Sequence, residues 1–118
     1  MQLLTAIELR IIKSMLVSQY GTDSPFIKQL DGSTVSGRRE TGVGIFVDLS
    51  PAATAPQGDQ INAEISGSCE TKAPPPSDSV GFTLFIRDGY LSFLEGYTYG
   101  TAEWAAGPME KWLVLDED

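Results

Sequence analysis

The chain contains no histidine and a single cysteine, Cys69, among its 118 residues. Histidine is the usual general base and a common metal ligand near neutral pH, so serine-histidine and cysteine-histidine catalytic arrangements are excluded in their usual forms. One cysteine cannot form an internal disulfide, and metal sites normally gather several ligating side chains. We therefore expect no metal and no cofactor, a reducing compartment, and a buried structural role for Cys69.

Basic residues are scarce as well. Eight lysines and arginines stand against sixteen acidic residues, and from Gln60 onward the ratio is three to ten. Such a field repels phosphate backbones and anionic lipids, while it speeds encounter with a basic partner. We predict no binding to nucleic acid or membranes; solubility alone is the other explanation of the charge. Arg38-Arg39 is the one basic pair, and on a strand its two side chains point to opposite faces.

The sequence also lacks a long hydrophobic run. Its N-terminus has no basic leader region, and Glu8, Arg10 and Lys13 interrupt the first apolar stretch. These features predict neither a signal peptide nor a membrane span, and therefore a cytoplasmic protein. The length and the 42% apolar composition are typical of a single globular domain over residues 1–118.

Apolar periodicity predicts one helix followed by strands. Residues 3–19 carry apolar side chains at helical spacing, and Gly21 is well placed to end that helix. Strands are predicted over residues 26–30, 34–40, 43–49, 61–69 and 111–115. In the third segment the alternation sets Phe46 and Asp48 opposite to Val43, Ile45, Val47 and Leu49. The expected fold is α+β, an N-terminal helix on a mainly antiparallel sheet of four to six strands.

The strongest local signal is a hairpin over residues 80–99 that turns at Asp88-Gly89, a pair that supplies the positive φ angles of a type I′ turn. A regular two-residue hairpin pairs Ile86 with Leu91, Leu84 with Phe93, Phe82 with Glu95 and Val80 with Tyr97. On this register Phe93, Glu95 and Tyr97 lie on the core face of the sheet, because directly opposed residues share a face.

This register makes Glu95 the acidic residue of greatest interest. A buried carboxyl has a raised pKa that suits proton transfer, so a pocket between helix and sheet is one interpretation, with Tyr97 or Tyr99 assisting. Alternatively, Glu95 lies at the sheet margin and bonds backbone amides or a basic side chain such as Arg87 or Lys111. Sequence reasoning identifies no second catalytic group.

Aromatic residues gather in the same region. Eight of the eleven lie between Phe82 and Trp112, close to several acids. Tyrosine and tryptophan beside acids are typical of binding interfaces, and equally of a lid over a core. The candidate binding residues are Glu95, Tyr97, Tyr99, Glu103 and Trp104.

Three blocks carry a resemblance, namely residues 41–46, 63–65 and 81–100. They resemble small uncharacterised bacterial proteins that share a phenylalanine-rich strand, an Asp-Gly or Asn-Gly turn and a Leu-Glu-Gly-Tyr ending, here Leu94 to Tyr97. The resemblance covers about the C-terminal two thirds of the chain. It implies the same strands and a bacterial cytoplasmic setting, and it supplies no role for these residues.

Together these features favour a non-catalytic protein whose acidic, aromatic C-terminal half binds a basic partner, as immunity proteins and antitoxins do by analogy. The first alternative is a small-ligand-binding domain or enzyme that uses Glu95. The second is a homodimer joined through a sheet edge or the aromatic surface.

Overall fold

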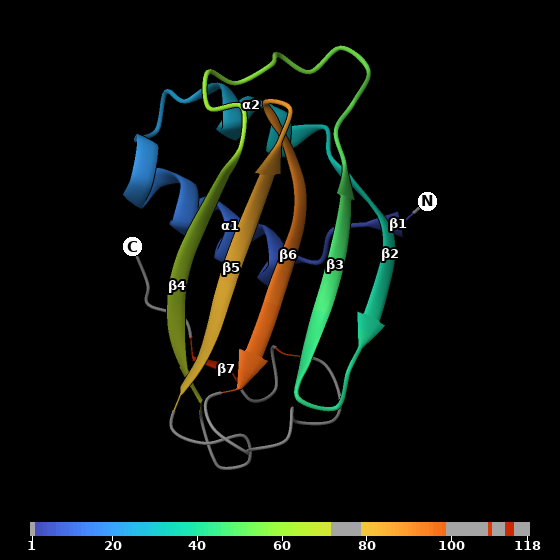
Figure 1. Cartoon of the computed structure of the whole chain (residues 1–118), viewed down its shortest axis with the longest axis vertical. Coiled ribbons are helices and arrows are strands. Elements are labelled where there is room, and N and C mark those ends of the chain that lie inside the picture. The colour runs from blue at the N-terminus through green and yellow to red at the C-terminus, as the bar shows by residue number, and fades with distance from the viewer. Residues whose placement is uncertain (1, 72–78, 99–108, 110–112, 115–118) are drawn as a thin grey trace.

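Two helices lie on one face of an antiparallel sheet in the computed structural model of the chain (Figure 1). The structure describes residues 2–71, 79–98, 109 and 113–114. The helices are α1 (Ala6–Tyr20) and α2 (Pro25–Asp31). The strands are β1 (Gln2–Leu3), β2 (Thr34–Glu40), β3 (Gly44–Ser50), β4 (Ala63–Thr71), β5 (Ser79–Arg87), β6 (Tyr90–Thr98) and β7 (Leu113–Val114).

The predicted α+β class is confirmed. Across the sheet the strands follow the order β1-β2-β3-β6-β5-β4-β7. The five strands of seven to nine residues agree with the predicted four to six, and the two-residue strands β1 and β7 add one at each edge. Strand β7 lies within the predicted last strand over residues 111–115 and pairs with the end of β4.

Helix α1 begins at Thr5, whose hydroxyl accepts a hydrogen bond from the Glu8 amide. The Glu8 carboxylate in turn accepts a hydrogen bond from the Thr5 amide, so the two side chains satisfy the backbone N–H groups of both residues. Leu3 was predicted to belong to this helix; it lies in β1 instead, 79% exposed. Gly21 ends the helix with a φ of 87°, as its position predicts. The apolar stripe that faces the sheet consists of Ile7, Ile11, Ile12, Met15 and Leu16.

Helix α2 corrects the prediction of a strand over residues 26–30. Ser24 caps the helix by accepting a hydrogen bond from the Phe26 amide at 3.1 Å, and Pro25 occupies the first helical position. Phe26 and Leu30 then lie one turn apart, and both are buried. Ser24 and Pro25, which follow the end of α1, therefore begin a new helix.

Strands β2 and β3, which correspond to the predicted strands over residues 34–40 and 43–49, pair as an antiparallel hairpin with Gly42 at a φ of 87° in its turn. The β3 side chains that face the helices are Ile45, Val47 and Leu49, as the alternation predicts. Val43 precedes the strand and is 51% exposed, so it does not share the buried face of the other three residues as the alternation predicts. Ile61 is equally exposed, because β4 begins two residues later than predicted.

The hydrophobic core lies between the helices and the sheet. Its sheet side is formed by fully buried side chains of β3, β5 and β6, among them Val47, Phe82, Leu84 and Leu94. Neither of the two described helices has the length and apolar character needed to cross a membrane.

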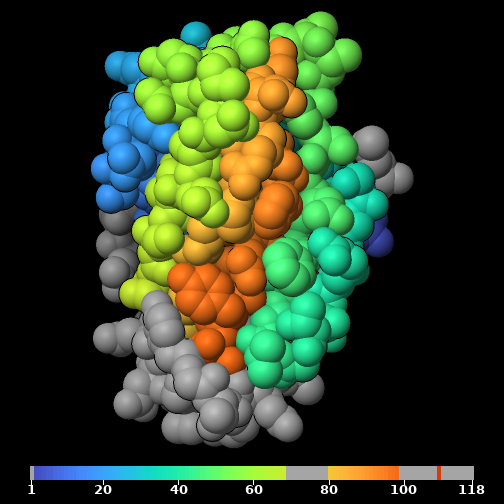
Figure 2. Space-filling model, viewed as in Figure 1, coloured from blue at the N-terminus to red at the C-terminus, as the bar shows by residue number. Residues whose placement is uncertain are grey.

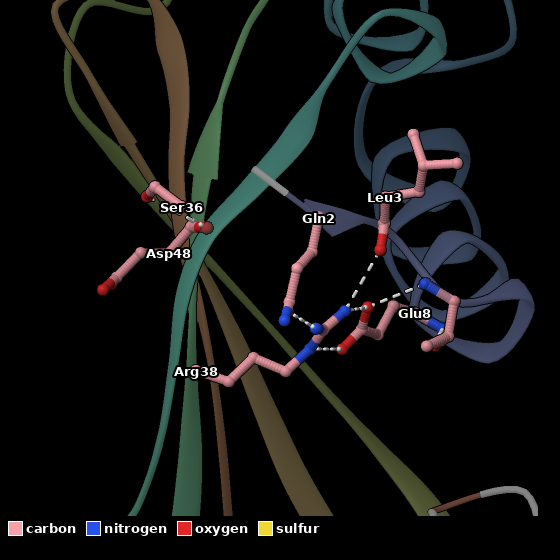
Figure 3. A network of polar contacts seen from close by, with 7 residues as sticks. Gln2, Leu3, Glu8, Ser36, Arg38 and Asp48 are labelled. Atoms are coloured by element: carbon pink, nitrogen blue, oxygen red, sulfur yellow. Dashed lines mark hydrogen bonds and ion pairs between the residues drawn. The ribbon is translucent and has the colours of Figure 1, made fainter.

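A buried ion pair joins α1 to β2 (Figure 3). The Glu8 carboxylate is almost inaccessible and accepts two hydrogen bonds from the Arg38 guanidinium, at 2.8 and 2.7 Å. Arg38 also donates to the Gln2 side chain and to the Leu3 carbonyl. The hydrogen bonds to Glu8 raise the pKa of Arg38 above its ordinary value. Arg39, on the other face of the strand, is largely exposed, so the predicted divergence of the pair is confirmed.

Arg38→Ala is expected to lower the free energy of unfolding by about 2–4 kcal/mol, because it leaves the Glu8 carboxylate buried without its partner. The matched control, Arg39→Ala, removes a neighbouring exposed guanidinium and should cost less than about 1 kcal/mol. Urea unfolding of the two variants followed by circular dichroism checks the difference. Equal losses would show that the Glu8 pair does not stabilise the fold.

Candidate functional site

The β5–β6 hairpin turns at Asp88-Gly89 as predicted. Both residues have positive φ angles, 55° and 80°, which is the conformation of a two-residue type I′ turn. The first two pairs beside the turn are Arg87 with Tyr90 and Ile86 with Leu91. Up to this point the hairpin has the register expected from the sequence.

Beyond Leu91 the predicted register is wrong, because β6 contains a bulge. Phe85 pairs with Phe93, so Ser92 is an extra residue with no counterpart on β5. The observed pairs beyond it are Leu84 with Leu94, Thr83 with Glu95, Phe82 with Gly96, Gly81 with Tyr97 and Val80 with Thr98. Every later side chain of β6 therefore lies on the opposite face from the predicted one.

The bulge removes a charged residue from the core face of β6. Opposite Leu84 it places Leu94, which is 1% exposed beneath the helices, instead of Phe93, and opposite Phe82 it places Gly96 instead of Glu95. Burying an unpaired carboxylate costs several kcal/mol, whereas burying a leucine is favourable by about 2 kcal/mol. Keeping the Glu95 carboxylate out of the core while Leu94 is buried there thus outweighs the disruption of one ladder position.

Gln29 of α2 satisfies the backbone groups beside the turn and the bulge. Its side chain is fully buried and accepts a hydrogen bond from the Leu91 amide at 2.9 Å. Its amide nitrogen donates to the carbonyls of Gly89 and Pro56, each at 2.8 Å. A single glutamine therefore connects α2, the hairpin turn and the loop between β3 and β4.

The face of the sheet that lies away from the helices carries a cluster of partly exposed aromatic side chains. Figure 2 shows this open face, with β5 and β6 at its centre between β3 and β4. We call it the aromatic face and define it by Phe46 of β3, Phe85 of β5, and Phe93, Glu95 and Tyr97 of β6.

Three phenylalanines of the aromatic face form a continuous row. Phe85 and Phe93 are stacked with their ring centroids 4.2 Å apart, and Phe46 contacts Phe93 at 6.1 Å in a tilted arrangement. An arginine lies over each end of the row: the Arg39 guanidinium is 4.8 Å from the Phe46 centroid and that of Arg87 is 5.2 Å from the Phe85 centroid. Cations favour such positions because the ring face is electronegative.

Tyr97 extends the aromatic face toward the other end of β6. It is paired with Gly81, and a side-chain carbon at Gly81 would come within 2.4 Å of the tyrosine ring, so the ring lies directly over the glycine. The Tyr97 hydroxyl accepts a long hydrogen bond from Thr83 at 3.5 Å, and Thr83 lies 3.4 Å from the Ser66 hydroxyl. A polar strip therefore borders the phenylalanine row.

Glu95 lies in the middle of the aromatic face. Phe46 and Thr83 are its partners on the two neighbouring strands, and Phe93 and Tyr97 precede and follow it on the same side of β6. Its side chain is partly buried. Among the residues that the structure describes, none forms an ion pair with Glu95 or donates a hydrogen bond to its carboxylate.

The structure brings two of the five candidate binding residues together, Glu95 and Tyr97. Tyr99, Glu103 and Trp104 lie outside the described residues, as does the side chain of Cys69. Sequence reasoning missed Phe85, Phe93 and the two arginines of the row. One sequence feature could have shown that Phe93 lies on the outer face. The consecutive apolar pair Phe93-Leu94, directly before Glu95, breaks strict alternation and indicates a bulge.

The interpretation that Glu95 lies in a pocket between helix and sheet is wrong, because the bulge directs its side chain away from the helices. The alternative contact with Arg87 is also not observed, since that guanidinium lies over Phe85 and donates to the Ile86 carbonyl. Within the described ranges no three metal-ligating side chains gather.

In comparisons with known proteins, no family model matches the chain, and no curated protein or solved structure matches it significantly. The resemblance based on the Leu94–Tyr97 block therefore stays a prediction.

Leu94→Ala is expected to lower the free energy of unfolding by about 2–5 kcal/mol, because it opens a cavity in the core. Its neighbour supplies the control: Glu95→Ala, on the aromatic face, should change stability by less than about 0.5 kcal/mol. Both variants can be compared by denaturant unfolding. Little or no loss for Leu94→Ala would instead support the regular hairpin without a bulge, in which Leu94 lies on the face away from the helices.

Proposed function

We propose that this protein is a non-catalytic binding domain whose aromatic face docks a basic protein partner. The observation that carries the proposal is the row of Phe46, Phe93 and Phe85, partly exposed on one open face of the sheet. Stacked aromatic side chains held by a sheet are rigid, so they lose little conformational entropy when a partner covers them. Such residues contribute disproportionately to protein interfaces.

The charge of the chain supports a basic partner. The formal net charge is −8, and the aromatic face itself is bordered by Asp48 and Glu64 in addition to Glu95. Its two arginines are engaged: Arg39 lies over Phe46 and within 3.8 Å of Asp48, and Arg87 lies over Phe85. Aromatic side chains on a sheet also bind nucleic-acid bases, but that binding needs an attraction for phosphates that this charge opposes.

A basic protein partner is also favoured over a second copy of the chain. Two copies would bring together two faces of like net charge, which opposes association at low salt. Immunity proteins and antitoxins offer the functional analogy, since they cover a basic partner without chemistry of their own. The homodimer is then an outcome that the binding test can detect.

Selection of short random displayed peptides against the immobilised protein tests the proposal. We expect enriched peptides to combine lysine or arginine with aromatic residues. Their binding should weaken at least about tenfold in Phe93→Ala, since truncating an interface aromatic typically costs more than about 1 kcal/mol. It should also weaken between about 0.1 M and about 1 M salt, as the Debye length shortens.

Leu9→Ala is the matched control, because Leu9 is an exposed apolar residue of α1 on the opposite side of the molecule. Peptides that bind Phe93→Ala as well as they bind the wild type would contradict the proposal, as would enrichment of acidic peptides. Sedimentation of the unliganded protein as a dimer that Phe93→Ala dissociates would assign the face to a second copy instead.

A further inference from the structure

We infer that Glu95, framed by Phe46, Phe93 and Tyr97, is the acceptor for an arginine side chain of the partner. The inference rests on the proposed function and adds the chemical group that the aromatic face recognises. A planar cation placed at the centre of the face would lie against aromatic carbon and pair with a carboxylate at the same time.

The first support is the environment of the carboxylate. Phe46 and Thr83 flank Glu95 across the strands, while the two aromatic residues of β6 lie before and after it. A partly buried carboxylate in this frame is less hydrated than one on an open surface, so a cation that reaches it gains more than at a fully exposed site. Within the described part of the chain, no cation occupies this position.

The second support is the position of two of the chain's own arginines. Arg39 and Arg87 lie over the two ends of the phenylalanine row, 4.8 and 5.2 Å from the ring centroids. The row is therefore a surface on which guanidinium groups stack. Its centre offers the same ring surfaces together with a carboxylate, and it is the part of the row that the chain's own guanidinium groups leave uncovered.

Arginine fits this position better than lysine. A guanidinium is planar, stacks on aromatic rings and presents parallel N–H groups that match the two oxygens of a carboxylate. A lysine ammonium is a compact, strongly hydrated charge, so its binding would be stabilised by the Glu95 carboxylate alone and not by stacking on the rings. The neighbouring hydroxyl strip of Thr83 and Ser66 supplies further acceptors within the same face.

Titration of the isotope-labelled protein with tetra-arginine amide tests the inference by nuclear magnetic resonance. Tetra-citrulline amide serves as the neutral isostere and tetra-lysine amide as the second cation. We expect tetra-arginine to shift the amide signals of Glu95 and its strand neighbours and to bind more tightly than either control peptide. Glu95→Gln should weaken the binding of tetra-arginine about tenfold, because the loss of a charge-assisted hydrogen bond typically has an effect of this size.

Glu64→Gln is the matched variant, because it removes the same charge from the same face next to Phe85. A loss confined to Glu95→Gln supports the inference. Equal losses in both variants would overturn the role of Glu95, while binding on the aromatic face would still support the proposed function. If Phe93→Ala leaves tetra-arginine binding unchanged, or no peptide shifts the aromatic face, both are overturned. Equal binding of tetra-lysine would overturn the preference for arginine.

Discussion

The hydrogen bonds of Gln29 and the bulge beside them determine which side of β6 faces outward. The Leu91 amide donates to the Gln29 side chain, and Gln29 donates to the carbonyl of Gly89 in the turn and to that of Pro56 in the loop between β3 and β4. Because the bonds to Leu91 and Gly89 are buried, leaving these two groups without partners would cost about 1–3 kcal/mol each. Ser92 can then stand outside the ladder, and the alternation of β6 is reset so that Leu94 enters the core.

The reset alternation produces two faces of different character. Toward the helices, the sheet presents apolar side chains that form the core, and a buried charge there is paired, as Glu8 is with Arg38. Away from the helices, the same strands present stacked phenylalanines, hydroxyl groups and a carboxylate that pairs with no cation of the described residues. Stability thus depends on one face, and the proposed binding uses the other.

Much of the fold could be predicted from local pattern. The amphipathic spacing of α1, the alternation of β3 and the Asp88-Gly89 turn each determine local structure with few competing alternatives. Helix α2 was missed because a segment of seven residues is too short for periodicity to distinguish from a strand. The bulge was missed because its stabilising partner, Gln29, is 62 residues away in sequence. Glu95 and Tyr97 remain candidate binding residues. The face of the sheet on which they lie could not be predicted, because it depends on the contact between Gln29 and Leu91.

Glu95 faces outward because β6 is bulged at Ser92. The most direct measurement is the set of backbone nuclear Overhauser effects across the hairpin. The bulged register predicts contacts between the backbones of Glu95 and Thr83 and between those of Phe93 and Phe85, the pairs observed in the sheet. Contacts of Glu95 with Phe82 and of Phe93 with Leu84 would contradict it, because they would return the carboxylate to the core face and remove the proposed binding site.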